Sequence, residues 1–476
     1  MRKSTFRIVI LLPLLCINSL ISQHQEVPEK PGIWRGGNSS TLDTQSILYA
    51  FKNGKFNGHL RHYFMSTDNA ALLKDYYANA SGGGIRYETR AYYGFKFAVS
   101  GFFVFNTGSS DLEQKDSITG ASNRYEIGLF DIEDPKNKKD IDRLEEFYLK
   151  YEYKNFNIIY GRQLINTPFV NLQDGRMRPT GVEGVWTHGV LHKKLKWEGG
   201  WLYAISPRST TKWYNVEQTI GVYSSGVSSL GQKSNYRGNI TSAGLFLGGL
   251  QYNPKSNMQI TAWNLLAENI FNASLFQIEV QKNVNNNTKV IAAAQGIHEF
   301  TVADGGNTNP SLAYADKGAK SYTFGFKLAV AATPWETSVN YNRITKHGRY
   351  LMPREFGRDP FFTFIPRERN EGLGDVHAFM ARALYKIPKY RIQSAIAVGH
   401  FTLPDVQNYT LNKYGMPSYN QVNIDVRYAF PARLNGLEMQ FLWVLKTNAG
   451  NTYGKDIYRI NKVDMVLYNL VLNFHF

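Results

Sequence analysis

The last fourteen residues constrain the fold of this chain more than any other feature. From Val463 to Phe476, apolar and polar residues alternate almost without interruption, with Asn469, Asn473 and His475 on one face. The other face carries Val466, Tyr468, Leu470, Leu472, Phe474 and Phe476. A period of two over this length predicts a β-strand with one face in hydrocarbon and the other in water. Because such a strand cannot leave its edge open in a membrane, the pattern predicts a closed β-barrel.

The N-terminal segment has the pattern of a secretory signal. Basic residues within the first seven positions precede an apolar run at 8–21, and we expect cleavage near Ser22. A short N-terminal anchor helix is the alternative. Cys16, the only cysteine, lies in this segment, so the mature chain would contain neither a disulfide nor a thiol. Removal of residues 1–22 as a signal peptide would lower the net charge from +16 to +13.

The composition of the remaining chain is typical of a β-barrel. No other apolar stretch reaches the roughly 18–20 residues that a membrane helix needs. The mean hydropathy is −0.35, as in a water-soluble protein, yet aromatic residues make up 14% of the chain. A barrel accounts for both values, because lipid-facing and water-facing residues average out and aromatic girdles add Tyr and Phe.

Strand-like segments follow one another with short turns and long loops in alternation. We count 18 of them, which begin near Phe56, Gly83, Phe95, Leu144, Phe156, Val182, Lys196, Ile240, Met258, Ala273, Thr288, Lys320, Trp335, Asp375, Tyr390, Tyr419, Leu437 and Val463. Short turns at one rim and long loops at the other are typical of bacterial outer-membrane barrels. An all-β, antiparallel transmembrane barrel of 18 strands is therefore expected over residues 56–476. An even strand number places both termini at the periplasmic rim.

Residues 23–55 do not share the strand pattern, and we interpret them as an N-terminal periplasmic or lumenal extension. A large soluble β-sandwich or β-helix is the alternative to a barrel. It explains neither the terminal phenylalanine nor the difference between the loops at the two rims, and the chain has no internal repeat.

Three segments resemble one known family. The first is Leu164–Thr180, preceded by Tyr160-Gly-Arg and followed by Glu183-Gly-Val-Trp. The second is Asn57–Asn69 with the tyrosine-rich stretch after it, and the third is Pro353–Glu371. Together they resemble the OprD family of substrate-specific outer-membrane porins, over about residues 56–476. The resemblance implies an 18-stranded barrel that is a monomer or packs as a loose homotrimer.

The resemblance also implies that loop 163–181 folds inward as a constriction loop. Pro168, Gly175 and Pro179 would stop it from continuing as a strand. Its polar groups would either contact solutes at the constriction or hold the loop to the barrel wall, and the sequence leaves both roles open. The candidate constriction residues are Asn166, Gln173, Asp174, Arg176 and Arg178.

Side-chain alternation assigns further charges to the barrel lumen. A charge on the lipid face costs about 2–4 kcal/mol at the bilayer midplane, so charged residues of the strands are expected to face water. The expected lumenal basic track is Arg61, Arg86, Arg90, Arg162, Arg382, Arg391 and Arg427, and the expected lumenal acidic residues are Glu88 and Asp425. Guanidinium groups would lower the barrier for an anion and bind a carboxylate bidentately. Alternatively, these arginines pair with acidic residues and stiffen the barrel.

Other functional classes fit the sequence less well. His188 and His192 would lie about 13 Å apart on a strand, too far to share one metal ion. An outer-membrane enzyme is a less favoured alternative, because the chain has no HExxH, GxSxG or Walker motif. Residues 23–55 are too few for the plug of a TonB-dependent transporter, and the basic residues are spread out rather than clustered as in a nucleic-acid binder. A non-selective general diffusion porin remains an open alternative.

The sequence therefore predicts an integral outer-membrane porin of a Gram-negative bacterium, with no enzymatic activity, cofactor or metal. It would pass small hydrophilic solutes passively, favouring amino acids, peptides and organic acids that bear a carboxylate. The expected partners are these solutes, outer-membrane lipid and the barrel-assembly machinery, whose recognition signal the terminal Phe476 resembles. No nucleic-acid partner is expected.

Overall fold

The computed structural model describes residues 44–172 and 176–476. The expected signal peptide at 1–22 and most of the expected extension at 23–55 lie outside these residues. In the described part, strands dominate and helices are short. No helix of the described residues is long and apolar enough to cross a membrane.

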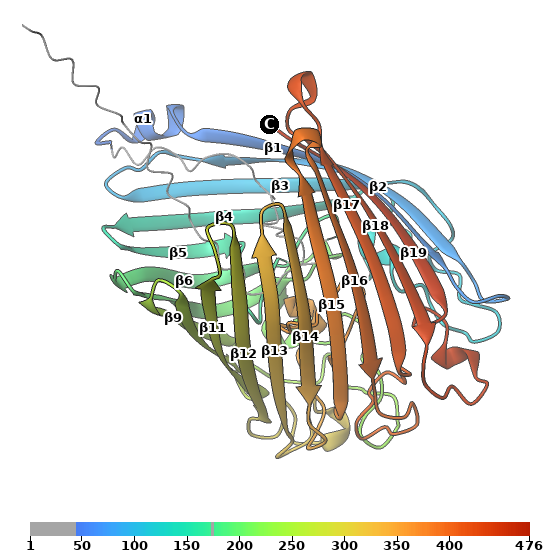
Figure 1. Cartoon of the computed structure of the whole chain (residues 1–476). Coiled ribbons are helices and arrows are strands. Elements are labelled where there is room, and N and C mark those ends of the chain that lie inside the picture. The colour runs from blue at the N-terminus through green and yellow to red at the C-terminus, as the bar shows by residue number, and fades with distance from the viewer. Residues whose placement is uncertain (1–43, 173–175) are drawn as a thin grey trace, which may run out of the picture.

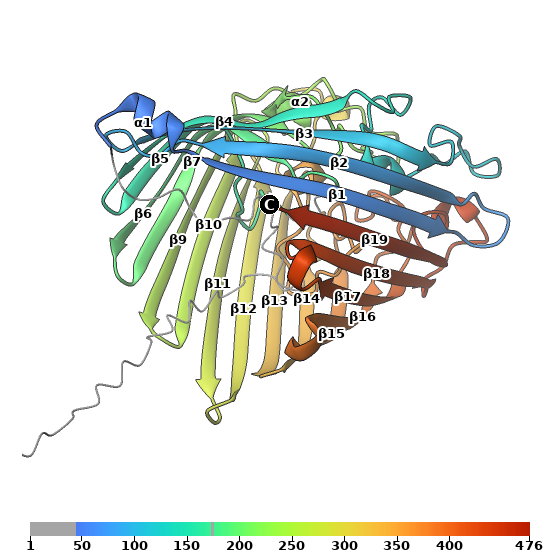
Figure 2. The ribbon, with the colours of Figure 1, turned by 90° about the horizontal axis from the view of Figure 1, so that it is seen from above.

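Eighteen strands follow one another around the barrel, and one further two-residue strand lies in a loop (Figures 1 and 2). The barrel strands are β1 Lys55–Asp68, β2 Tyr76–Glu88, β3 Phe95–Ser109, β4 Ile141–Tyr153, β5 Phe156–Gln163, β6 Gly181–His192, β7 Leu195–Ser206, β9 Leu245–Lys255, β10 Met258–Ala267, β11 Phe271–Asn283, β12 Thr288–Thr301, β13 Lys320–Ala332, β14 Trp335–Ile344, β15 Val376–Ile387, β16 Ile392–Thr402, β17 Tyr419–Ala429, β18 Leu437–Asn448 and β19 Met465–His475. The loop elements are β8 Tyr214–Asn215 and the helices α1 Ile47–Lys52 and α2 Val216–Thr219. The predicted count of 18 barrel strands is confirmed.

The barrel closes where the first strand meets the last. β1 pairs antiparallel with β19, with His59 opposite His475, and in Figure 2 the two strands lie side by side. The backbone N–H of Gly58 donates to the carbonyl oxygen of Phe476 at 2.7 Å, and the N–H of Phe476 donates to that of Gly58 at 3.1 Å. The chain terminus therefore completes the sheet, so the barrel has no free edge.

Two strand starts differ from the sequence prediction by five or more residues. β2 begins at Tyr76 rather than Gly83, because the glycines at 82–84 lie inside the strand and do not precede it. β9 begins at Leu245 rather than Ile240, because Ile240 still belongs to the loop before this strand, where its side chain is buried. The other predicted starts lie within three residues of the observed ones.

Side chains alternate between a lipid-facing and an inner face. In β19, Tyr468 points outward, while Asn469 and Val471 point inward and are buried. In β3, Phe103 and Phe105 are exposed on the outer face, while Phe102 and Val104 are buried on the inner face. This agrees with the alternation predicted from the C-terminal residues.

The inner face of β6–β15 carries an apolar area beside polar residues such as Gln277 and Gln295, which the alternation alone does not predict. Two loops fold into the barrel and pack against this face, namely the described part of 163–181 (163–172 and 176–181) and the loop between β14 and β15 at 345–375. Phe169, Phe356 and Phe361 of these loops are almost completely buried. They join inner-wall residues such as Leu202, Leu247 and Leu265 in one hydrophobic cluster. Burying each such side chain contributes about 1.5–3 kcal/mol, so this cluster stabilises the inward position of both loops.

Candidate functional site: the loops in the barrel and a basic vestibule

Loop 163–181 is attached to the barrel wall by a buried ion network at its C-terminal end. Arg178 donates from Nε to Oε1 of Glu145 at 2.6 Å, and Arg143 lies 2.8 Å from the same carboxylate. Arg143 also donates to the backbone carbonyl of Pro179 at 2.6 Å. The Glu145 side chain is completely buried. One carboxylate thus holds two guanidinium groups, and one of these groups holds the loop backbone.

The two inward loops are joined by hydrogen bonds. The N–H of Asn171 donates to the carbonyl of Phe356 at 3.0 Å. The side chain of Asn171 donates to the carbonyl of Arg358 at 3.0 Å and accepts from the N–H of Arg358 at 3.2 Å. Thr180 donates to the carbonyl of Glu355 at 2.9 Å. The loops therefore form one body inside the barrel.

Loop 345–375 contacts widely separated parts of the wall. Gln295 of β12 donates to the carbonyl of Pro360 at 2.9 Å, and Gln421 of β17 donates to that of Pro366 at 2.6 Å. Lys446 of β18 donates to the carbonyl of Arg367 at 3.2 Å. Because these strands lie far apart around the barrel, the loop crosses the lumen and narrows it.

At the long-loop end of the barrel lies a cavity of about 1500 Å³, which we call the vestibule. Its lining combines the inward loops with parts of the loops at 110–140, 207–244, 403–418 and 449–464. Among the described residues, eleven lysines and arginines line it, against three acidic residues. The basic residues are Arg124, Arg176, Arg208, Lys233, Arg237, Arg354, Arg358, Arg367, Arg369, Lys413 and Lys462.

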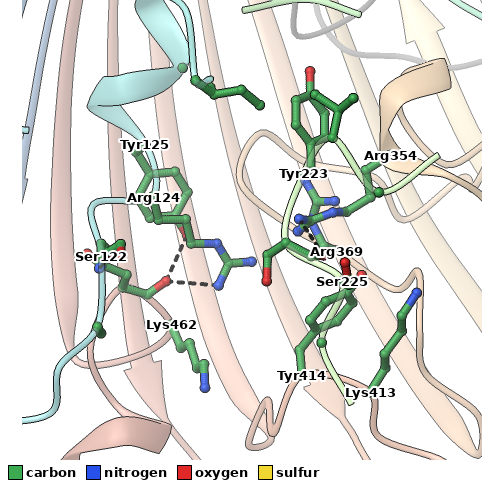
Figure 3. A pocket seen from close by; sticks show the side chains of 18 of the residues that line it. Ser122, Arg124, Tyr125, Tyr223, Ser225, Arg354, Arg369, Lys413, Tyr414 and Lys462 are labelled. Atoms are coloured by element: carbon green, nitrogen blue, oxygen red, sulfur yellow. Dashed lines mark hydrogen bonds between the residues drawn. The ribbon is translucent and has the colours of Figure 1, made fainter. Parts of the chain in front are cut away.

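Basic side chains face one another across the vestibule (Figure 3). Arg124 and Lys462 lie on one side, while Arg354 and Arg369 lie on the other beside Tyr223 and Tyr414. A solute in this space would have guanidinium groups and aromatic rings on both sides, since Tyr125 lies beside Arg124.

Close packing of these cations shifts their proton affinities. Burial lowers the pKa of Arg369, and the guanidinium groups of Arg354 and Arg124 lower it further. Burial, with Arg124 nearby, lowers the pKa of Lys462 to about 7. Burial is the main cause of both shifts, and the neighbouring guanidinium groups act in the same direction.

Acidic groups neutralise part of the lining. Glu371 lies 3.2 Å from Nζ of Lys413 and 3.9 Å from Nε of Arg354. Glu133 forms an ion pair with Arg237. Asp359, a lining residue, has its pKa raised to about 6, mainly by burial, with Glu371 also raising it and Arg369 opposing. The vestibule keeps a basic excess after these contacts are counted.

The predicted constriction residues have different positions in the structure. Gln173 and Asp174 lie outside the described residues. The Asn166 side chain is exposed, and its amide oxygen accepts from the N–H of Leu172 at 3.3 Å. Arg176 is buried and lines the vestibule, whereas Arg178 belongs to the ion network with Glu145. The sequence left open whether Arg178 contacts solutes or attaches the loop to the barrel wall, and in the structure it contacts the wall residue Glu145.

Four of the predicted track residues lie on the inner face of the barrel. They are Arg61, Arg86, Arg382 and Arg427, and the acidic residues Glu88 and Asp425 lie on the same face. Arg86 forms ion pairs with Glu88 and with Glu146, and Arg427 lies 2.9 Å from Asp425. Much of the charge on this inner wall is thus compensated within the wall.

Two predicted track residues lie at the short-turn rim instead. β2 ends at Glu88, so Arg90 lies beyond the strand, where its Nε donates to the carbonyl of Asn53 at 3.1 Å. Arg391 is exposed in the turn between β15 and β16 and has a left-handed backbone with φ of 54°. The predicted strands were too long at these ends, so the predicted lumenal positions of Arg90 and Arg391 are wrong.

Arg162 faces the membrane side, so its predicted lumenal position is wrong. It is paired directly with Phe147, whose side chain is 52% exposed on the outer face. Its Nε lies 3.0 Å from the carboxylate of Glu183, and its guanidinium group lies 4.7 Å from the ring centre of Trp213. Arg162 is the penultimate residue of β5 at the long-loop end. Near the interface a lipid-facing charge costs only about 0–1 kcal/mol, so alternation did not exclude this position.

Side-chain alternation does not identify most vestibule residues, because they lie in loops and not in strands. One signal was present: Arg354, Arg358, Arg367 and Arg369 fall within sixteen residues of one loop. Such a density of arginine among buried aromatic residues could have marked this loop as a lumenal one.

Comparisons with known proteins agree with this architecture. The family model described as "outer membrane porin, OprD family" matches residues 52–332. Among solved structures, Pseudomonas aeruginosa OccK9 (OpdG) is similar with a TM-score of 0.69 at 13% identity, covering 90% of this chain and 99% of that one. Acinetobacter baumannii OccAB4 is similar with a TM-score of 0.67 at 16% identity, covering 89% of this chain and 98% of that one. Pseudomonas aeruginosa OpdK, solved with vanillate, has a TM-score of 0.64 at 13% identity, covering 90% and 99%.

No curated protein matches the chain in sequence. At these identities the solved structures show a shared fold, and the family match spans more than half of the 476 residues. Members of the matched family are channels for small solutes rather than enzymes. The chain belongs to the OprD family of outer membrane porins, and it is an integral β-barrel of the outer membrane.

Proposed function

We propose that this porin favours small hydrophilic solutes that bear a carboxylate, such as amino acids, short peptides and organic acids. The observation that carries the proposal is the vestibule, where eleven basic residues and three acidic ones line a space of about 1500 Å³. A planar guanidinium group binds a carboxylate through two parallel hydrogen bonds, so an arginine-lined entrance favours this group by geometry as well as by charge.

The path that we propose begins in the vestibule and passes the inward loops. Arg124 and Arg369 would receive the carboxylate from opposite sides. Arg176, with Asn166, Gln173 and Asp174, would form the constriction, while Arg178 would hold the loop in position. On the inner wall, Arg61, Arg86, Arg382 and Arg427, with Glu88 and Asp425, would line the way toward the periplasm. Asp174 would be suited to an amino group of the solute.

A non-selective general diffusion porin is the competing interpretation. It requires an open, water-filled lumen with little interaction between the wall and the solute. The two inward loops and the apolar cluster around Phe169 and Phe356 occupy much of the lumen and favour a selective channel.

Liposome swelling with matched solutes tests the proposal. A dicarboxylate, the diamide of the same carbon skeleton and the corresponding diamine differ mainly in their end groups. We expect the dicarboxylate to enter faster than the diamide, and the diamine to enter slowest, because the vestibule attracts anions and repels cations. Equal rates for the three solutes would favour the general diffusion porin.

A double variant that removes two vestibule charges tests whether the preference for carboxylates arises in the vestibule. Arg124→Gln with Arg369→Gln should reduce the preference for the dicarboxylate and leave diamide entry little changed. Arg459→Gln serves as the matched control, because Arg459 is a loop arginine paired with Asp456 and Asp464 and does not line the vestibule. A preference that survives in the double variant would place the selectivity elsewhere in the channel.

A further inference from the structure

The membrane-facing surface of the barrel has two apolar grooves. The larger, of about 960 Å³, crosses β7 and β9–β13. The smaller, of about 580 Å³, crosses β11–β15. Their outward position follows from their lining, since Phe276 and Phe324 border the larger groove and Phe326 and Phe379 the smaller, and all four are exposed on the outer face.

The larger groove arises because small outward residues follow one another in register. Gly199 is opposite Gly248, Gly248 is opposite Asn264, and Asn264 is opposite Ser274. Bulky outward residues border this row on either side, among them Trp197 and Phe276. In the smaller groove, Ala292 and Ala294 lie between larger apolar residues. Because directly paired residues of neighbouring strands share a face, the grooves are continuous depressions across strands.

Polar groups occur on this face where the larger groove approaches the long-loop rim. Nδ2 of Asn264 donates to Oδ1 of Asn272 and to Oγ of Ser274, both at 2.9 Å. His298 lines the same groove and stacks on Tyr322 with ring centres 4.7 Å apart. Such groups are costly in pure hydrocarbon, so their position suits the headgroup or acyl-linkage region of a lipid.

Four histidines mark the rim above the two grooves, and we call them the histidine rim: His298, His347, His377 and His400. Three of them lie within three residues of the long-loop ends of β12, β15 and β16, on the outer face. The fourth, His347, packs edge-on against Tyr322 at 5.5 Å. Tyr341, which lines the smaller groove, contacts Nδ1 of His377 at 2.8 Å.

Basic side chains accompany the histidine rim. Lys320 lies opposite the outward Phe300 and is exposed, and Lys346 is exposed one residue before His347. Arg343 lies on the outer face beside the carboxylate of Asp375, an acidic group in this region. Imidazole, ammonium and guanidinium groups are all hydrogen-bond donors to phosphate oxygens.

We propose that the outer surface of β7 and β9–β16 binds a phosphorylated lipid with several acyl chains, with its chains in the two grooves and its phosphate at the histidine rim and Lys320. The membrane location indicates the chemistry of the chains, because this face lies at the depth of the bilayer hydrocarbon. The basic and imidazole groups fix the chemistry of the headgroup. Since the rim is at the long-loop end, the lipid belongs to the outer leaflet.

Native mass spectrometry of the purified full-length barrel in detergent tests the proposal. The probes are bisphosphorylated lipid A, its dephosphorylated counterpart and phosphatidylethanolamine. We expect the bisphosphorylated form to stay bound and the other two to dissociate. The variant His298→Gln with His377→Gln and Lys320→Gln should lower its retention by about tenfold. The variant Ala262→Phe with Ala294→Phe, which fills both grooves, should lower it similarly.

His62→Gln is the matched control, because His62 also faces outward, on β1, and lies far from both grooves. It should retain the lipid as the wild type does. Unchanged single-channel conductance would show that each variant is folded, since none of these residues faces the lumen. Equal retention of the dephosphorylated lipid, or full retention in either multiple variant, would overturn the proposal. A lipid-free dimer that the groove-filling variant dissociates would also overturn it, by assigning the surface to a second copy.

Discussion

At the scale of single residues, Lys462 is a vestibule cation whose charge depends on pH near neutrality. Its side chain is half-buried in the vestibule wall, and its ammonium donates to the carbonyl of Ile457 at 2.8 Å. Burial and the neighbouring Arg124 lower its pKa to about 7. Below this value Lys462 is charged and adds to the positive potential, and above it the side chain becomes neutral. Protonation of one residue therefore adjusts the attraction for anions within the physiological range.

We expect anion selectivity to be higher at pH 6 than at pH 8. Reversal potentials in planar bilayers under a KCl gradient measure this directly. The variant Lys462→Met removes this titrating group, so its selectivity should change less between the two pH values than that of the wild type, and the remaining change reports the other titrating lining group, Asp359. A wild-type profile that is flat between pH 6 and pH 8 would contradict the role of Lys462.

Arg162 shows that the face on which a charged strand residue lies depends on its depth in the membrane. A rule that charges face the lumen holds at mid-membrane, where the cost on the lipid side is about 2–4 kcal/mol. It placed Arg61, Arg86, Arg382 and Arg427 on the inner face, as the structure does. At the rim a lipid-facing charge costs little, so the alternation rule no longer determines on which face a charged residue lies. There the pairing of Arg162 with Glu183 and its contact with Trp213, a residue of a distant loop, set the direction.

At the scale of elements, the position of loop 163–181 depends on the Glu145 carboxylate. Replacement by Gln removes the charged carboxylate that the buried guanidinium groups of Arg143 and Arg178 both contact. Removing one partner of such a buried network costs about 3–5 kcal/mol. We therefore expect Glu145→Gln to lower the free energy of unfolding by a few kcal/mol, measured by urea unfolding of the barrel in lipid vesicles.

Glu152→Gln provides the comparison. Glu152 also pairs with two cations, Lys96 and Lys150, but its side chain is 33% exposed on the inner wall. Lys96 is buried, but Lys150 and the Glu152 carboxylate are partly open to water, so this variant should lose much less stability than Glu145→Gln. Similar losses in both variants would show that the Glu145 network is no more important than a partly exposed pair.

The strands could be predicted from the sequence, but the paths of the loops could not. A strand such as β19 or β12 reveals itself through local alternation, because its two faces meet different solvents. Loop 345–375 is positioned by contacts that are far apart in the sequence, with Gln295 at one side and Gln421 at the other. Resemblance to a family indicated that loop 163–181 turns inward. Nothing local in the sequence identifies Glu145 as the carboxylate that holds it.

At the scale of the whole molecule, the charge distribution separates into a compensated wall and a basic entrance. Ion pairs such as Arg86 with Glu146 and Arg427 with Asp425 compensate the inner wall, whereas the vestibule keeps a basic excess. The net charge of +16 correctly indicated a basic excess, but could not place it. Fixed charges gathered around a water-filled entrance attract counter-ions before any specific contact forms.

This arrangement predicts a channel whose anion selectivity depends on ionic strength. The Debye length is about 10 Å at 0.1 M salt and about 3 Å at 1 M. At low salt the opposed walls of the vestibule act on a passing ion together, whereas at high salt only direct contacts remain. Reversal potentials measured at a fixed tenfold KCl gradient should therefore show strong anion selectivity at low mean concentration and weaker selectivity near 1 M. Arg124→Gln with Arg369→Gln should flatten this dependence, while Arg459→Gln should preserve it. Selectivity that is independent of salt would mean that short-range contacts at the constriction, and not the field of the vestibule, choose the ion.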